Sequence, residues 1–99
     1  MTEPTIITVP LETPLKRDAG ELTQLRFRKP VSGDLRGMSI AKLGQLDYDE
    51  QRKLLPRISL DGLIAAEVDQ LDVADQLEIS GALTDFLVPK RRMAEFQAA

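Results

Sequence analysis

Three aspartates at a regular spacing are the first groups in the chain that could do chemistry. Asp69, Asp72 and Asp75 stand three residues apart, and paired carboxylates can bind a metal ion or share a proton in acid–base catalysis. Acidic residues also gather at helix N-termini, where they cap the helix and interact favourably with its dipole. We favour capping and solubility for these aspartates over a metal or catalytic site.

The residue types that the chain lacks narrow the chemistry further. It contains no histidine and no cysteine. Disulfides, histidine or cysteine metal sites, and the nucleophilic triads that need either residue are therefore excluded. We expect no catalytic residue, no bound metal and no cofactor, and we predict that the protein is not an enzyme.

A segment rich in glycine and positive charge, "RKPVSGDLRGMSI" at residues 28–40, could form a phosphate loop. It lies between a predicted strand and a predicted helix, but it lacks the GxGxxG and GxxxxGKS/T patterns of nucleotide-binding loops. We favour a connecting loop or a docking segment in which Pro30 and Gly33 form the turn. If Gly33 adopts a positive φ there, Gly33→Val should lower thermal stability. Asp34 and Arg36 could cap the helix, form an ion pair or contact a neighbouring subunit.

Basic side chains around the second predicted strand could form a nucleic-acid patch. Arg26, Arg28, Lys29 and Arg36 would make a basic edge. Strand alternation turns Phe27 to the opposite face, where it cannot stack on bases. We favour a solvated strand face over a nucleic-acid site.

The net charge of −3 hides an uneven distribution. Residues 61–88 contain seven acidic residues and no basic one, which makes them a poor surface for a polyanion. A basic run at Lys90–Arg92, followed by Met93 and Phe96, could dock a partner, although we favour a frayed chain end. Nucleic-acid binding would have to use the first half or the tail, and we do not favour it.

Length and composition predict one small domain, and the strand and helix patterns described below predict an α+β fold, a hairpin followed by three or four short helices. The chain has 99 residues, of which 42% are hydrophobic and 29% charged, a globular composition. It has no apolar run of about 18 residues and no signal-peptide pattern at its start, so we expect a soluble cytosolic protein with no membrane contact. We expect the domain at residues 1–89, with a hairpin at about 5–29, a helical part at about 34–88 and a mobile tail at 90–99.

Two segments, residues 5–12 and 21–29, alternate with the period of a β-strand. The faces expected to be apolar comprise Ile7, Val9 and Leu11 on the first strand and Thr23, Leu25 and Phe27 on the second. Pro10 cannot donate to a ladder, so the first strand should be an edge strand or be broken there. A lone hairpin is marginal in water, so helices or other chains must cover its apolar face.

The segment after the hairpin predicts two short helices. Ser32 or Asp34 could cap the first. Its apolar stripe would consist of Leu35, Ile40, Leu43 and Leu46. Asp47 and Glu50 have the spacing of a capping box and should begin the second helix, which Pro56 ends or kinks.

Two further helices are predicted in the second half of the chain. A short one lies near residues 63–71, and Asp72 caps a longer one that Pro89 stops. The apolar stripe of the longer helix comprises Ile79, Ala82, Leu83, Phe86 and Leu87, extended upstream by Val73 and Leu77. We expect most of this stripe in the core, and part of it could serve oligomerisation.

Four motifs follow one another in a specific order. They are "VPLETPLKR" at residues 9–17, "LTQLRFRKPVSGDLRGMSI" at 22–40, "LPRIS" at 55–59 and "LDVAD" at 71–75. Over about residues 8–88 this order resembles the bacteriophage tail assembly chaperone family, the E/41/14 group of contractile-tailed, Mu-like phages. Phe27 stands where a smaller aliphatic residue is usual, which fits a side chain that faces the core.

The resemblance implies a role in virion morphogenesis, in the cytoplasm of a host bacterium that carries the phage or prophage. Members of the family are thought to bind the long helical tape-measure protein and keep it soluble until tail-tube subunits polymerise around it. They are absent from the finished particle, and many are also made in a longer form by a ribosomal frameshift. The resemblance thus implies a tape-measure partner and, as a further partner, a tail-tube protein. Independently of the resemblance, the scarcity of aromatic residues and the strand edge lead us to expect a homo-oligomer.

We hypothesise that a partner binds the connecting segment and the last helix. The residues concerned are Arg28, Lys29, Ser32, Gly33, Leu35, Arg36, Leu83, Phe86 and Leu87. The alternative is a small phage nucleic-acid-associated or regulatory protein that uses the basic face of the second strand. A salt-dependent shift of DNA or RNA at about 0.15 M salt would favour that alternative.

Overall fold

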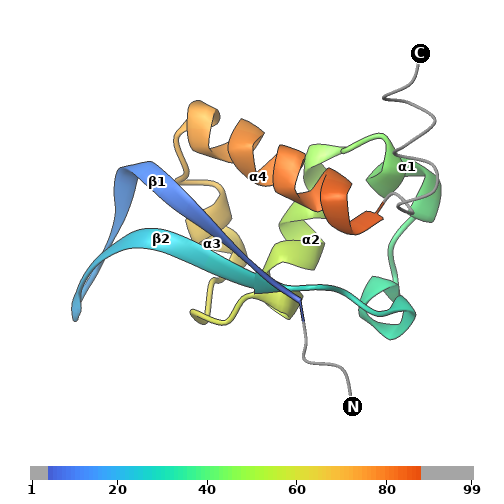
Figure 1. The fold of residues 1–99 in the computed structure, drawn as a ribbon, viewed down its shortest axis with the longest axis horizontal. Coiled ribbons are helices and arrows are strands. Elements are labelled where there is room, and N and C mark those ends of the chain that lie inside the picture. Colours follow the sequence, from blue (N-terminus) through green and yellow to red (C-terminus); the bar gives the residue numbers. More distant parts are fainter. Residues whose placement is uncertain (1–4, 88–99) are drawn as a thin grey trace.

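The computed structural model of the chain describes residues 5–87, which form an N-terminal β-hairpin packed against a helical layer (Figure 1). The elements in chain order are β1 (Ile6–Arg17), β2 (Gly20–Arg28), the 3₁₀ helix η1 (Ser32–Leu35), α1 (Ile40–Gly44), α2 (Tyr48–Ile58), α3 (Ala65–Val68) and α4 (Val73–Leu87). The predicted α+β class, a hairpin followed by helices, is confirmed. Pro89 and the tail predicted at 90–99 lie outside the described residues.

The hairpin contains a large bulge that shifts its apolar face. The antiparallel register runs without a break to Pro10, opposite Gln24, and resumes at Leu15, opposite Leu22. Residues 11–14 of β1 therefore lie opposite Thr23 alone. Such bulges increase the local twist of the strand pair. As a result Leu22 packs against the core and Thr23 is exposed, so the prediction of Thr23 on the apolar face is wrong.

A carboxylate from the last helix satisfies the backbone of this bulge. The amides of Glu12 and Thr13 donate to the side chain of Asp75 at 2.8 and 3.1 Å. Asp75 is only 1% exposed. Its neighbour Asp72 caps α4 by accepting from the amide of Ala74 at 2.9 Å, as predicted.

Pro10 lies on the outer edge of the sheet, where its missing N–H removes no ladder bond. The amide of Lys29 donates to the carbonyl oxygen of Thr5 at 2.9 Å. Bonded and non-bonded pairs alternate along an antiparallel ladder. The odd-numbered residues from 5 to 9 therefore face β2, and the even-numbered residues from 6 to 10 direct their backbone groups away from it. This confirms the prediction of an edge strand.

The other edge of the sheet is covered by the segment that follows α2. The amide of Leu60 donates to the carbonyl of Arg26 at 2.9 Å, and Phe27 forms a bridge with Ser59. The amide of Arg26 donates to the carboxylate of Asp61 at 2.8 Å. Both backbone groups of Arg26 are thus paired on the edge of β2 that faces away from β1.

The helix predicted between the hairpin and Asp47 is two separate elements. η1 ends at Leu35, and α1 begins at Ile40 with Ser39 as its cap, accepting from the amide of Lys42 at 3.2 Å. Gly37, between them, has a φ of +79°, a conformation that glycine adopts without strain. Ile40 follows this break and is 71% exposed, so its predicted place in an apolar stripe is wrong.

Gly33 does not have the positive φ that the sequence suggested, because the chain makes its turn at Gly37 instead. The positive-φ glycines among residues 5–87 are Gly20, Gly37 and Gly62. The expected loss of stability in Gly33→Val therefore has no basis in the backbone. Gly37 is the glycine of this loop that a larger residue would strain.

Helix α2 begins as predicted but continues past its proline. Asp47 accepts from the amide of Glu50 at 3.3 Å and caps the helix. The side chain of Glu50 turns away and accepts from the amide of Ser39 at 2.7 Å, which ties α1 to α2. Pro56 was predicted to end or kink the helix. It lies within the helix, which ends at Ile58, so the first of these two outcomes is wrong, and a kink stays a prediction. A proline near a helix end removes only one backbone bond, to the residue four positions earlier.

In its first part, helix α4 buries a different face from the one that its apolar residues predicted. Asp75, Ile79 and Leu83 are buried, and Ala82, Phe86 and Leu87 pack against the core as expected. Val73 and Leu77 are 74% and 66% exposed, which contradicts their predicted place in the stripe. Each lies two residues from Asp75, about 200° around the helix. Because the bulge holds Asp75 inward, both must point outward.

The core consists mainly of leucine, isoleucine and valine from both layers, with Phe27 as its buried aromatic residue. Leu25 and Phe27 of the hairpin are at most 2% exposed. They belong to the same cluster as Leu54 and Ile58 of α2. Among residues 5–87, no helix has the length and apolar character that a bilayer span requires.

Asp75→Ala should lower the free energy of unfolding by about 2–4 kcal/mol, because it leaves two bulge amides without an acceptor. Asp75→Asn should lose less, since one side-chain oxygen can still accept. Urea unfolding followed by circular dichroism measures both. The control is Glu78→Gln on the exposed side of α4, which should change stability by no more than about 0.5 kcal/mol. Equal stabilities of Asp75→Ala and the control would show that the bulge does not need this carboxylate.

Candidate partner-binding surfaces

The connecting segment is held in shape by an ion pair. The guanidinium of Arg28 donates two bonds to Asp34, from Nη1 to Oδ2 at 2.8 Å and from Nη2 to Oδ1 at 2.9 Å. Asp34 also accepts from the amide of Val31 at 2.8 Å. The two-bond arrangement fixes orientation as well as distance. The ion pair that the sequence offered as one role for Asp34 therefore forms, with Arg28.

Arg57 at the end of α2 fastens the same segment from the other side. Its Nη1 donates to the carbonyl oxygens of Asp34 at 2.8 Å and of Arg36 at 2.7 Å. In return, Nη2 of Arg28 donates to the carbonyl of Arg57 at 3.1 Å. The segment is a folded connection docked on α2, and the side chain of Arg36 makes no hydrogen bond or ion pair within residues 5–87.

The Arg28 hydrogen bonds are the main reason that the pKa of Asp34 is lowered to about 2, from an ordinary value of 3.8. The amide of Val31 contributes to the same shift. The pKa of Arg28 is raised by the same pairing. The pair is thus fully charged at neutral pH.

The predicted partner-binding residues fall into two groups. Lys29, Ser32, Gly33 and Arg36 are exposed, and Arg28 is partly exposed. The other four face the core: Leu83 is 1% exposed, and Leu35, Phe86 and Leu87 are partly buried against the same hydrophobic cluster. Only the first group lies open on the surface, and a role of any of these residues in binding stays a prediction.

The basic face of β2 is largely paired with carboxylates. Arg26 contacts Asp61 at 2.9 Å, and Arg28 contacts Asp34 at 2.8 Å. Phe27 is 2% exposed and belongs to the core, as its alternation predicted. Less free positive charge is therefore available here than the sequence suggested.

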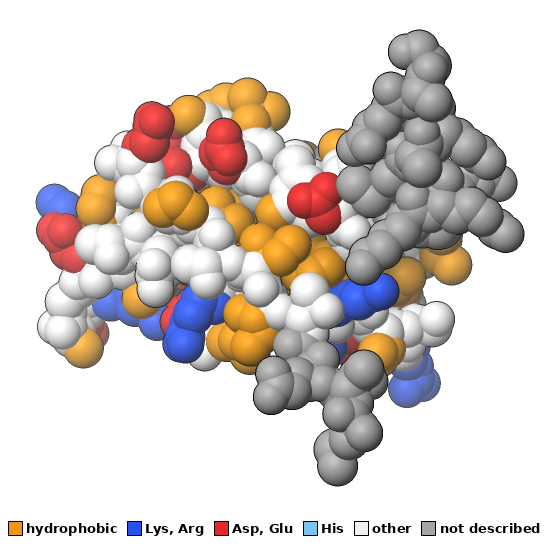
Figure 2. Space-filling model, in the orientation of Figure 1, with side chains coloured by type: hydrophobic (Ala, Val, Ile, Leu, Met, Phe, Trp, Pro, Cys, Tyr) orange, Lys and Arg blue, Asp and Glu red, His pale blue; other side chains and the backbone are white. Residues whose placement is uncertain are grey.

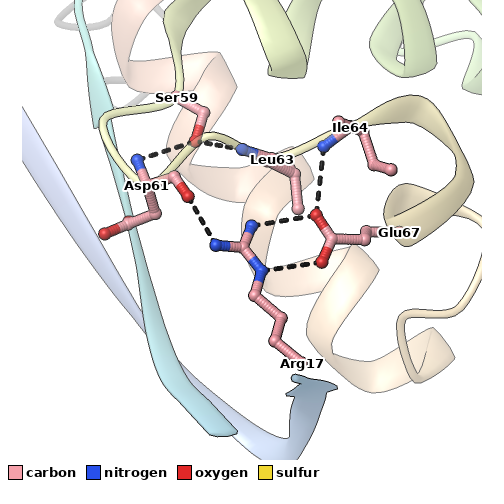
Figure 3. A network of polar contacts seen from close by, with 6 residues as sticks. All are labelled: Arg17, Ser59, Asp61, Leu63, Ile64 and Glu67. Carbon is pink, nitrogen blue, oxygen red and sulfur yellow. Dashed lines mark hydrogen bonds and ion pairs between the residues drawn. The ribbon is translucent and has the colours of Figure 1, made fainter. Parts of the chain in front are cut away.

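A second polar network holds the start of the hairpin turn against α3 (Figure 3). Arg17 donates to both carboxylate oxygens of Glu67, at 2.8 and 2.9 Å, and to the carbonyl of Asp61 at 2.8 Å. Ser59 accepts from the amides of Asp61 and Leu63 at 3.1 and 3.2 Å, which shapes the intervening loop. The sequence placed Arg17 in a motif without assigning it a partner. Its partner lies fifty residues away, and residue spacing carries no signal of such a contact.

The three regularly spaced aspartates, Asp69, Asp72 and Asp75, have separate structural roles. Asp72 and Asp75 bond to the backbone of α4 and of the bulge, as described above. Asp69 accepts from Arg52 at 3.0 Å and from the hydroxyl of Tyr48 at 2.7 Å, and these bonds lower its pKa. Within residues 5–87 no group of three acidic side chains is arranged to hold a metal ion.

An open groove of about 340 Å³ lies between β1 and α4. Residues 7–10 of β1 form one wall. The other wall is helical and includes Leu77, Gly81 and Ala82. Figure 2 shows hydrophobic side chains in this hollow, with acidic side chains on the α4 side. The sequence did not predict the groove, because it placed Leu77 in the core.

Together these features define a small α+β domain with a groove of mixed apolar and acidic lining beside an open strand edge, an arrangement suited to binding another protein chain. Comparison with known proteins identifies the family of the chain. The family described as phage tail assembly chaperone proteins, E, or 41 or 14, matches residues 8–88. The chain belongs to this family, as its motifs indicated.

Two relatives come from Escherichia phage P2. Tail assembly protein E is 34% identical over 89 residues, which cover 90% of this chain and 96% of that protein. Tail assembly protein E′ is 34% identical over 88 residues, which cover 89% of this chain but only 61% of that longer protein. No solved structure matches the chain.

The stability that Asp34 contributes should disappear in acid. Its pKa is lowered to about 2 in the folded protein from an ordinary 3.8, so the contribution is complete well above pH 3.8 and is lost as the pH falls through 3.8 toward 2. We expect the wild-type protein to be more stable than Asp34→Asn by about 1 kcal/mol at pH 6, with a smaller difference at pH 4 and again at pH 3. Urea unfolding at the three pH values measures this.

A double-mutant cycle with Arg28→Met is the control, because it separates the ion pair from other effects of each substitution. The coupling energy between residues 28 and 34 should shrink over the same pH range. A coupling energy that stays constant from pH 6 to pH 3 would contradict the assignment.

Proposed function

We propose that the protein binds its phage's tape-measure protein and keeps it soluble while the tail tube polymerises around it. The family match over residues 8–88 carries this proposal. In this role the protein acts in the cytoplasm of the host bacterium and is absent from the mature virion. The tail-tube protein is a further proposed partner, and self-association stays a prediction from the sequence.

Exposed apolar side chains support a chaperone role. Val31, Ile40, Val73 and Leu77 are each 66% to 74% exposed. Large exposed apolar residues that gather on one surface often mark a binding site. Leu77 borders the groove between β1 and α4, so at least one of them extends an apolar surface that a client could cover.

The nucleic-acid alternative gains no support from the geometry. Arg26 and Arg28 would have to leave Asp61 and Asp34 to bind phosphates. Each departure would expose a carboxylate that repels the polyanion. We therefore do not favour this role.

Co-expression tests the proposed function. The tape-measure protein of the same phage, produced with this protein, should be recovered in the soluble fraction at least fivefold more than when it is produced with an unrelated small acidic protein. A tagged copy of this protein should retain the tape-measure protein after nuclease treatment at about 0.15 M salt. Retention and recovery are read on the same gels.

An unchanged soluble fraction and no retention would overturn the proposal. A shift of DNA or RNA by the purified protein at the same salt concentration, without retention of the tape-measure protein, would favour the nucleic-acid alternative instead.

A further inference from the structure

The outer edge of β1 offers backbone groups for a further strand. Because odd-numbered residues pair with β2, Ile6 and Thr8 direct their N–H and C=O groups outward. None of these groups hydrogen-bonds to another described residue outside the hairpin. An unpaired strand edge of this kind is a template for an added strand.

The open part of this edge has a defined length. Pro10 offers no N–H, and beyond it the carboxylate of Asp75 occupies the amides of Glu12 and Thr13. The opposite edge of the hairpin is covered at Arg26 by Leu60 and Asp61, as described above. An added strand would therefore pair at Ile6 and Thr8 and would end before the bulge.

The groove that runs along this edge would receive the side chains of such a strand. Leu77 and Ala82 supply apolar surface on the wall from α4. No described atom lies within 4 Å of the position that a Cβ would take at Gly81, so this part of the groove is open. Extended peptides that add to a sheet edge gain affinity from backbone bonds and specificity from such adjacent pockets.

The negative charge of the groove favours a basic partner segment. Glu78 and Asp85 line it, and none of its lining residues is lysine or arginine. A second copy paired edge to edge would bring two such acidic walls together, which costs free energy. A segment that carries lysine or arginine beside its apolar residues would be attracted.

We propose that β1 and α4 bind an extended segment of a partner protein as a third strand of the sheet. The segment is apolar where it faces Leu77 and Ala82 and basic where it passes Glu78 and Asp85. The proposal rests on the proposed function, since it places this segment in the tape-measure protein. It adds the mode of recognition, which is strand addition rather than the docking of a helix.

The test uses overlapping 15-residue peptides that cover the tape-measure protein, with binding to the full chain measured by fluorescence anisotropy. The peptides that bind should be those rich in both apolar and basic residues. Thr8→Pro removes one outward N–H, as Pro10 does naturally, and should weaken binding at least tenfold. Thr8→Val keeps the amide and should bind at least fivefold more tightly than Thr8→Pro.

A second variant keeps the proposal testable if Thr8→Pro does not fold. Gly81→Leu fills the groove and places a better helix former in α4, so its melting temperature should match or exceed that of the wild type while peptide binding falls at least tenfold. Gly44→Leu in α1 is the matched control, because no described atom lies within 4 Å of its Cβ position either. It should bind peptides within twofold of the wild type.

Three results would overturn the strand-addition proposal: no peptide binds, Gly81→Leu binds as tightly as the wild type, or the wild type is a dimer that Thr8→Pro converts to a monomer. The last would identify a second copy as the occupant. If wild-type protein and Gly81→Leu solubilise the tape-measure protein equally on co-expression, the groove is wrong but the chaperone function stands. If neither solubilises it and no peptide binds, both proposals fail.

Discussion

The contact between Asp75 and the bulge of β1 is the interaction on which the arrangement of the domain depends. A two-stranded hairpin is marginal in water, and this one is interrupted where residues 11–14 face a single residue of β2. The bulge leaves amides that β2 cannot pair, and α4 supplies their acceptor. The same contact fixes the rotation of α4, since Asp75 must point inward. That rotation places Ile79 and Leu83 in the core and Leu77 beside the groove.

Ion pairs then fix the hairpin at three further points along its length. Arg17 is bound near the turn, Arg26 in the middle of β2 and Arg28 at its end, each by a carboxylate from a helix, a loop or η1. Partly exposed pairs contribute little free energy individually. Their effect is on geometry, because each arginine forms at least two bonds to its carboxylate. They hold the hairpin in one orientation over the helices and leave the outer edge of β1 open.

The strands and the larger helices could be predicted from the sequence because they depend on local patterns. Alternation identified the hairpin, and the capping residues Asp47 and Asp72 marked the starts of α2 and α4. The rotation of α4 could not be predicted, since a periodicity of residue types assigns an aspartate to the surface. Its burial depends on a bulge more than sixty residues earlier in the chain.

The surface residues were harder to predict than the fold for the same reason. Two glycines in the connecting segment look equivalent in sequence, and the sequence does not show which of them takes the positive φ, which in the folded chain is Gly37. The basic residues around β2 suggested a free charged face, because their partners Asp61 and Asp34 are set by folding. The groove could not be predicted, because one of its walls contains Leu77, which the helical periodicity placed in the core.

The chain order of the bulge contact has a consequence for synthesis on the ribosome. Glu12 leaves the ribosome before its acceptor Asp75, which follows 63 positions later. The entropy cost of closing so long a loop comes before the contact can contribute any stability. This slows folding. We therefore expect the hairpin to stay incomplete on the nascent chain until α4 has left the exit tunnel, so the domain should fold as one unit rather than with the hairpin first.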